Sequence, residues 1–187
     1  MILDIAIGIL LSIGVSLFFH MELTWFFVSV GIIFALLPDV DFLLMALSKK
    51  KINGINYKHR KGLHYPLIFI PIGVILILLF DKEYSMLFGL AVLWHFIHDS
   101  AIISWGVQWF WPFSSKYFSF FRKSIGGEKP GLAFRVLYIW SPEEVEKMSN
   151  KYGDPEWIKN LYFKLNPVLI IEIVFLFFAL AILLLKI

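Results

Sequence analysis

The chain contains no cysteine, and charged residues make up only 17% of its 187 positions. Without cysteine there can be no disulfides, thiolate metal sites or cysteine nucleophiles, so any metal must be held by histidine and carboxylate side chains. The formal net charge is only +3. This is too small an excess to indicate nucleic-acid binding, and we expect no specific nucleic-acid partner.

Apolar residues are abundant instead. They account for 59% of the chain, with a mean hydropathy of +0.79, whereas soluble domains are about 45–50% apolar. The apolar residues form five runs, at residues 2–19, 23–37, 66–80, 84–103 and 167–185. The pattern predicts an all-α, multi-spanning membrane protein with about five transmembrane helices in a single domain, residues 1–187. The first run lacks a basic leader, so we expect a span rather than a cleaved signal peptide.

Residues 114–165 form the longest polar stretch, and we expect it to lie at the membrane surface. Ser141, followed by proline and two glutamates, is typical of a helix start, and Gly153 can end that helix. The segment 154–156, Asp-Pro-Glu, predicts the start of a second short interfacial helix. The tryptophan-rich stretch 104–113 is typical of an aromatic belt at a membrane border.

Basic residues fall mainly on one side of these five spans. Six lie in residues 48–65 and nine in residues 104–165, which together hold all but two of the 17 lysines and arginines. The positive-inside rule makes that side cytoplasmic. We therefore expect a multi-pass protein of the cell's inner membrane, with a cytoplasmic N-terminus.

The fourth apolar run contains the sequence W-H-F-I-H-D at residues 94–99. His95 and Asp99 are four residues apart and therefore share one face of a helix, and His98 can share it too. Ionisable side chains within a membrane are costly and usually functional. A divalent metal would offset that cost, although the pair could instead hydrogen-bond to each other or to a neighbouring helix.

Further candidate ligands lie at the ends of other runs. Asp39 and Asp41 flank Val40 after Pro38, where they could bind a hard cation or zinc. Alternatively, one of them could cap a short helix predicted at Phe42–Ser48. The basic loop that follows contains His59 and His64. These could converge across a turn or simply face lipid headgroups.

The predicted topology brings these groups together on the cytoplasmic side. Two further acids, Asp4 in the first run and Glu172 in the last, reach the same level. We interpret Asp4, His98 and Glu172 as residues that orient the ligands or serve as extra ligands.

The ordered motifs L-L-P-D-V-D, H-R-K-G-L-H, H-x-x-x-D and G-V-Q-W-F-W-P-F resemble those of the YdjM-like family of membrane-bound, metal-dependent hydrolases. The resemblance covers about residues 1–115, and Asp4 stands where that family usually has a histidine. It implies metal ligands drawn from six residues: Asp39, Asp41, His59, His64, His95 and Asp99. The family is also similar to zinc-dependent phospholipases C and single-strand nucleases, a fold-level analogy.

The leading hypothesis is therefore a phosphoesterase with one or more zinc-like ions, acting on a membrane lipid or lipid-linked substrate at the cytoplasmic interface. A metal-activated water would be the nucleophile. Asp39 or Asp41 would serve as a base, and Arg60 would bind the phosphate. Two alternatives stay open. One is a non-enzymatic protein with a structural or degenerate metal site, and the other is an ion or proton pathway.

Overall fold

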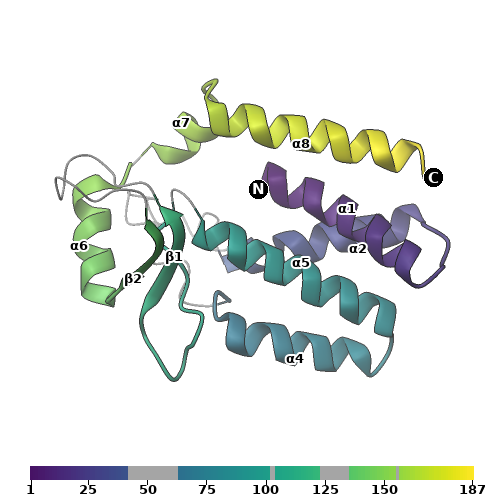
Figure 1. Ribbon diagram of the computed structural model, residues 1–187, viewed down its shortest axis with the longest axis horizontal. Coiled ribbons are helices and arrows are strands. Elements are labelled where there is room, and N and C mark those ends of the chain that lie inside the picture. The colour runs from purple at the N-terminus through teal and green to yellow at the C-terminus, as the bar shows by residue number, and fades with distance from the viewer. Residues whose placement is uncertain (42–62, 102–103, 123–134, 155) are drawn as a thin grey trace. The chain divides into compact units, whose positions relative to one another are not determined.

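The computed structural model describes residues 1–41, 63–101, 104–122, 135–154 and 156–187 (Figure 1). The chain divides into two compact units, which we describe separately. Unit 1 comprises Met1–Asp39, Ile70–His95 and Ile158–Ile187, and unit 2 comprises Val40–Phe69 and Phe96–Trp157.

The five apolar runs fold as helices close to their predicted bounds. These are α1 (Ile2–Phe18), α2 (Trp25–Leu36), α4 (Pro66–Leu78), α5 (Lys82–Ser100) and α8 (Pro167–Leu184). Side-chain caps define the starts of α2 and α8. Thr24 Oγ1 accepts from the Phe27 N–H, and Asn166 Oδ1 accepts from the Leu169 N–H, which satisfies amide groups that have no partner within the helix.

Five membrane spans are not confirmed. Among the described helices, α8 alone is long and apolar enough to cross a membrane by itself, with 18 residues and a mean hydropathy of 2.9. Helices α1, α2 and α4 have 17, 12 and 13 residues, which corresponds to about 26, 18 and 20 Å, against a hydrocarbon core of about 30 Å. Helix α5 has 19 residues but contains charged and imidazole side chains.

In unit 1, α1 packs against α2 and α8 (Figure 1). The contact buries six apolar side chains, namely Ala6, Ile9, Ile13, Val28, Ala179 and Leu183. Helices α1 and α2 approach each other closely at Gly8, where an added Cβ would lie 2.8 Å from the carbonyl oxygen of Gly31. This packing sets the position of Asp4 and of the end of α2, where the first candidate ligands lie.

The all-α prediction is wrong for part of unit 2, which contains a two-stranded antiparallel sheet. Strands β1 (Tyr117–Arg122) and β2 (Arg135–Trp140) pair with Tyr117 opposite Trp140. Aromatic and β-branched residues predominate in both strands, and such residues fit a pleated, half-buried surface.

The predicted helix starts in the polar segment are confirmed. Helix α6 (Pro142–Tyr152) begins with a capping box between Ser141 and Glu144 and ends at Gly153, and α7 (Trp157–Tyr162) follows. Helix α6 packs on the sheet through Val145, which lies against Tyr117. The helix predicted at Phe42–Ser48 lies outside the described residues.

Candidate metal centre

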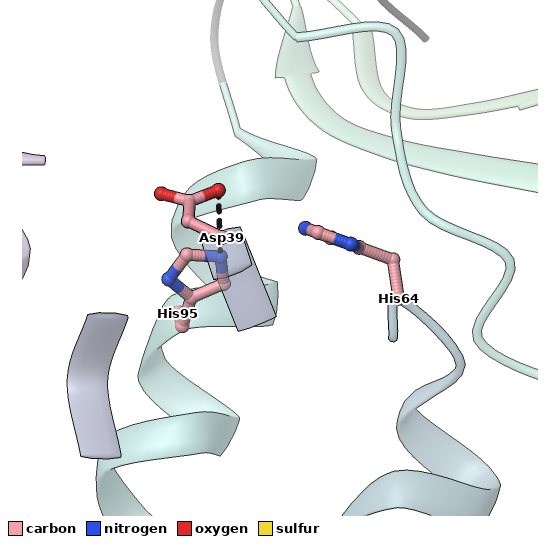
Figure 2. A group of neighbouring side chains, drawn as sticks. All are labelled: Asp39, His64 and His95. Atoms are coloured by element: carbon pink, nitrogen blue, oxygen red, sulfur yellow. Dashed lines mark ion pairs between the residues drawn. The ribbon is translucent and has the colours of Figure 1, made fainter. Parts of the chain in front are cut away.

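The first cluster of candidate ligands lies in unit 1, around His95 of α5. This imidazole is 1% exposed, and its Nδ1 lies 2.8 Å from the carbonyl oxygen of Ala35. A carbonyl can only accept, so Nδ1 carries the proton and Nε2 keeps the lone pair that a metal requires. Nε2 lies 3.7 Å from Oδ1 of Asp39, the contact drawn as a dashed line in Figure 2.

A 3₁₀ turn, Leu37–Asp39, brings Asp39 to this position at the end of α2. In such a turn the donor to the carbonyl of Ala35 would be residue 38, a proline without an N–H. The carbonyl is therefore available to His95. The same proline lies within the turn that carries Asp39, so one short segment of the chain positions both partners of the imidazole.

The separation of Nε2 and Oδ1 suits two ligands of one cation. At 3.7 Å the two atoms are farther apart than the 2.7–3.2 Å of a normal hydrogen bond. Ligands bound tetrahedrally to zinc at about 2.0–2.2 Å lie roughly 3.3–3.5 Å apart. A small closing movement of either side chain would allow both atoms to bind one ion.

Two further acids of unit 1 are buried near this cluster. Asp4 is 1% exposed, and its Oδ1 lies 3.9 Å from Nδ1 of His95. Glu172 of α8 is also buried, and its Oε2 accepts from the N–H of Leu3 at 3.4 Å. Asp4 thus lies beside the imidazole, whereas Glu172 contacts the first turn of α1, which carries Asp4.

The second cluster lies in unit 2, around His64. This imidazole is fully buried, with Nδ1 3.0 Å from Oδ2 of Asp41 and Nε2 3.4 Å from Oδ2 of Asp99. The other carboxylate oxygen of Asp41, Oδ1, is buried and accepts no hydrogen bond from the described residues. A buried acceptor in that state is costly unless a ligand satisfies it.

The two clusters share one arrangement. In each, an oxygen acceptor faces Nδ1 of a buried histidine and a carboxylate oxygen faces Nε2, the usual environment of a histidine that binds a metal. Asp39, His64 and His95 supply one carboxylate and two imidazoles, which could hold a metal ion (Figure 2). The donor types and the buried oxygen of Asp41 therefore fit a divalent cation.

The remaining predicted residues are less constrained. His59 and Arg60 lie outside the described residues, and His98 is half-buried on α5, so the roles given to them stay predictions. Sequence reasoning allowed a hydrogen bond to a neighbouring helix but did not identify the carbonyl of Ala35 as the partner of His95. The signal was the proline three residues later, which deprives that carbonyl of a 3₁₀ donor.

Comparisons with known proteins agree with the resemblance seen in the motifs. Searches of the curated proteins and of the solved structures found no match, and the similarity to phospholipases C and nucleases stays a prediction. The sequence model of a family described as YdjM inner membrane protein matches residues 3–186. The match covers nearly the whole chain and indicates an inner-membrane location. The chain belongs to the YdjM inner membrane protein family.

Proposed function

We propose that the protein is a metal-dependent hydrolase of the inner membrane, and that it cleaves a phosphoester in a lipid or lipid-linked substrate at the cytoplasmic face. The observation that carries the proposal is the geometry of His95. Its imidazole is buried, its Nδ1 is held by a backbone carbonyl, and its Nε2 faces Asp39 at 3.7 Å.

The covalent chain supports a single centre built from both clusters. Asp39 and Asp41 are two residues apart, so their Cα atoms are separated by at most about 7 Å. His95 and Asp99 are one turn apart on the same helix, α5, with Cβ atoms about 5–6 Å apart. Each cluster thus takes one acid from the Asp39–Asp41 segment and one residue from α5.

We assign the ligand atoms to Nε2 of His95, Nε2 of His64 and the carboxylates of Asp39 and Asp99. Asp41 holds His64 through Nδ1, and its second oxygen is a further ligand or the base. His59 would complete the set and Arg60 would bind the phosphate, since a guanidinium matches phosphate oxygens with two parallel donors.

A divalent metal bound there would act as a Lewis acid toward the phosphoester and lower the pKa of a bound water to about 7. The protein's own part is to fix the two imidazoles. The Ala35 carbonyl and the Asp41 carboxylate each hold a ring by Nδ1, which would leave Nε2 available to bind a cation. Nitrogen and carboxylate donors favour zinc, with manganese the next choice.

Metal analysis and activity of the purified full chain would test the proposal. We expect zinc or manganese in stoichiometric amount, and release of phosphate or headgroup from phospholipid in detergent micelles. His95→Ala should lose both while eluting like the wild type in size-exclusion chromatography. The matched control is His20→Asn, because His20 is exposed and has a φ of 53° that asparagine tolerates.

Two outcomes would contradict the proposal. Wild-type protein that takes up no metal after incubation with zinc or manganese would remove the centre. Metal bound by wild type and lost from His95→Ala, without hydrolysis of any lipid phosphoester, would replace the hydrolase with a structural metal site.

A further inference from the structure

The two faces of the unit 2 sheet differ in character. Tyr117 and Ser119 are buried on one face, where Val145 of α6 packs. The other face carries the register pairs Phe118–Ile139 and Phe120–Leu137. Leu137 and Ile139 are 44% and 49% exposed, so large apolar side chains cover this face without being buried.

The apolar face continues into the aromatic turn that precedes β1. The ring of Phe110 packs edge-on against Phe118, with centroids 5.1 Å apart, and is itself half exposed. Phe113, in the same turn, is 87% exposed. We call this combined surface the aromatic platform, and it comprises Phe110, Phe113, Phe118, Phe120, Leu137 and Ile139.

The charged residues of α6 lie on the side of the sheet opposite the aromatic platform. Glu143, Glu144, Lys147 and Lys151 are all exposed. The strands and α6 therefore form an amphipathic layer. Its α6 side is charged, and its other side is aromatic and aliphatic up to the register pair Arg122–Arg135 at the end of the sheet. A contiguous apolar patch of this kind on a soluble surface usually marks an interaction site.

Other features of unit 2 indicate that the aromatic platform contacts a membrane. Trp111, within the aromatic turn, stacks on Tyr65 at 4.3 Å between ring centroids. Tyr65 immediately precedes α4, where Leu67 is 43% exposed among a run of apolar residues. The aromatic turn is thus continuous with the apolar surface of α4, in a chain whose family is an inner membrane one.

We propose that the aromatic platform rests in the lipid bilayer, at the boundary between headgroups and acyl chains. It would be a second attachment of the chain, formed by a sheet rather than by a spanning helix. Aromatic rings are favoured at that depth, and burial of the aliphatic side chains removes their apolar surface from water.

The platform is also connected to the cluster around His64. Phe120 packs near Trp109, Trp109 near Phe96, and Phe96 near His64, with successive ring centroids 6.1, 6.4 and 5.9 Å apart. Insertion of the platform would therefore set the height of His64 relative to the lipid headgroups. This inference does not depend on the proposed hydrolysis.

Single cysteines give a direct test, because the chain has none of its own. Ile139→Cys on the platform and the matched control Lys147→Cys on α6 would each carry an environment-sensitive nitrobenzoxadiazole label. Both proteins would be reconstituted as full chains into phosphatidylcholine–phosphatidylglycerol vesicles with iodide on both sides. Nitroxides attached near the top of the lipid acyl chain would report contact with lipid.

We expect the label at residue 139 to be quenched by the lipid nitroxide at least several-fold more than the label at residue 147, and iodide to show the reverse order. Equal quenching of both labels by iodide would overturn the proposal. Efficient oxidative cross-linking between two Ile139→Cys copies, without lipid quenching, would also overturn it and assign the platform to a second copy of the chain. Loss of hydrolysis would not affect either readout.

Discussion

His95 and His64 are held in different ways, although each is a buried imidazole with a carboxylate facing Nε2. Nδ1 of His95 donates to a backbone carbonyl, that of Ala35, whereas Nδ1 of His64 faces the carboxylate of Asp41. A carboxylate makes the imidazole a more basic ligand, and a side-chain substitution can remove it. The carbonyl is part of the α2 backbone, so no substitution of a side chain removes it. The His95 cluster is therefore positioned by helix packing and the His64 cluster by side-chain contacts.

The largest expected effect is on zinc affinity, and it differs between Asp39 and Asp41. Asp39→Asn should lower the affinity for zinc by more than about 100-fold, because it replaces a proposed ligand. Asp41→Asn should lower it by about 10–100-fold, the usual result of removing a group that orients a histidine ligand. Titration of the purified protein with zinc, in competition with a chelator of known affinity, would measure both.

Equal losses in the two variants would contradict this assignment of roles, and Asp41 would then be a ligand through its buried Oδ1. Asp81→Asn is a suitable control, since Asp81 lies in the turn before α5 and far along the helix from His95. It should leave the zinc affinity unchanged.

Much of the first cluster could be predicted from the sequence. The H-x-x-x-D pair on α5 and the two acids after Pro38 were recognised from their spacing along one segment. Residues this close in the sequence stay close in the folded chain. The acceptor to which Nδ1 of His95 donates could not be predicted so directly, because every residue has a backbone carbonyl and the sequence does not show which one is available. Its availability depends on how α2 ends.

The sheet in unit 2 was missed for a different reason. Ser141, Pro142 and Gly153 are strong local signals, and the helix they predict is present. The strands Tyr117–Arg122 and Arg135–Trp140 pair across twelve intervening residues, and their aromatic residues also suit the membrane surface, where residues 114–165 were expected to lie. Composition alone does not distinguish the two.

The next effect tests whether helix packing positions the His95 cluster. Gly8→Ala would place a Cβ 2.8 Å from the backbone oxygen of Gly31 and should force α1 and α2 apart. We expect it to lower the free energy of unfolding by about 1–3 kcal/mol, as overpacking does, and to weaken zinc binding. Thermal unfolding in detergent, followed by size-exclusion chromatography, would measure the stability.

Gly14→Ala is the matched control on the same helix, since nothing lies within 4 Å of its added Cβ. It should raise stability by about 0.5–1 kcal/mol through helix propensity. If Gly8→Ala behaved like Gly14→Ala, the close contact of α1 with α2 would not support the cluster.

A smaller effect concerns α5, the helix that carries residues of both clusters. Oδ1 of Asp81 accepts from the N–H groups of Tyr84 and Glu83 at 3.0 and 2.8 Å. The hydrogen bond from Tyr84, followed by those from Glu83, lowers the pKa of Asp81 below its ordinary 3.8. The stabilisation is therefore complete above about pH 4 and is lost as the pH falls through the lowered pKa.

Asp81→Ala should lower the unfolding free energy by about 1 kcal/mol at pH 7, the usual cost of removing such a cap. Asp81→Asn keeps an acceptor oxygen but does not titrate, so its stability relative to wild type should improve as the pH falls below 3.8. Measurements of unfolding in detergent between pH 7 and pH 3 would show whether the stability of the variant approaches that of the wild type. A constant difference across that range would contradict the cap.

The smallest effect should leave both clusters intact. Ser141→Ala removes the acceptor for the Glu144 N–H, at 3.2 Å, from the capping box of α6. It should lower local stability by about 1 kcal/mol or less, because the helix end is exposed, and Ser141→Thr should restore it. Hydrogen exchange should quicken in α6 but not in α1 or α2, and zinc affinity should stay at the wild-type value. Since α6 packs on the face of the sheet opposite the aromatic platform, a change in zinc affinity here would mean that the water side of unit 2 also helps to position His64.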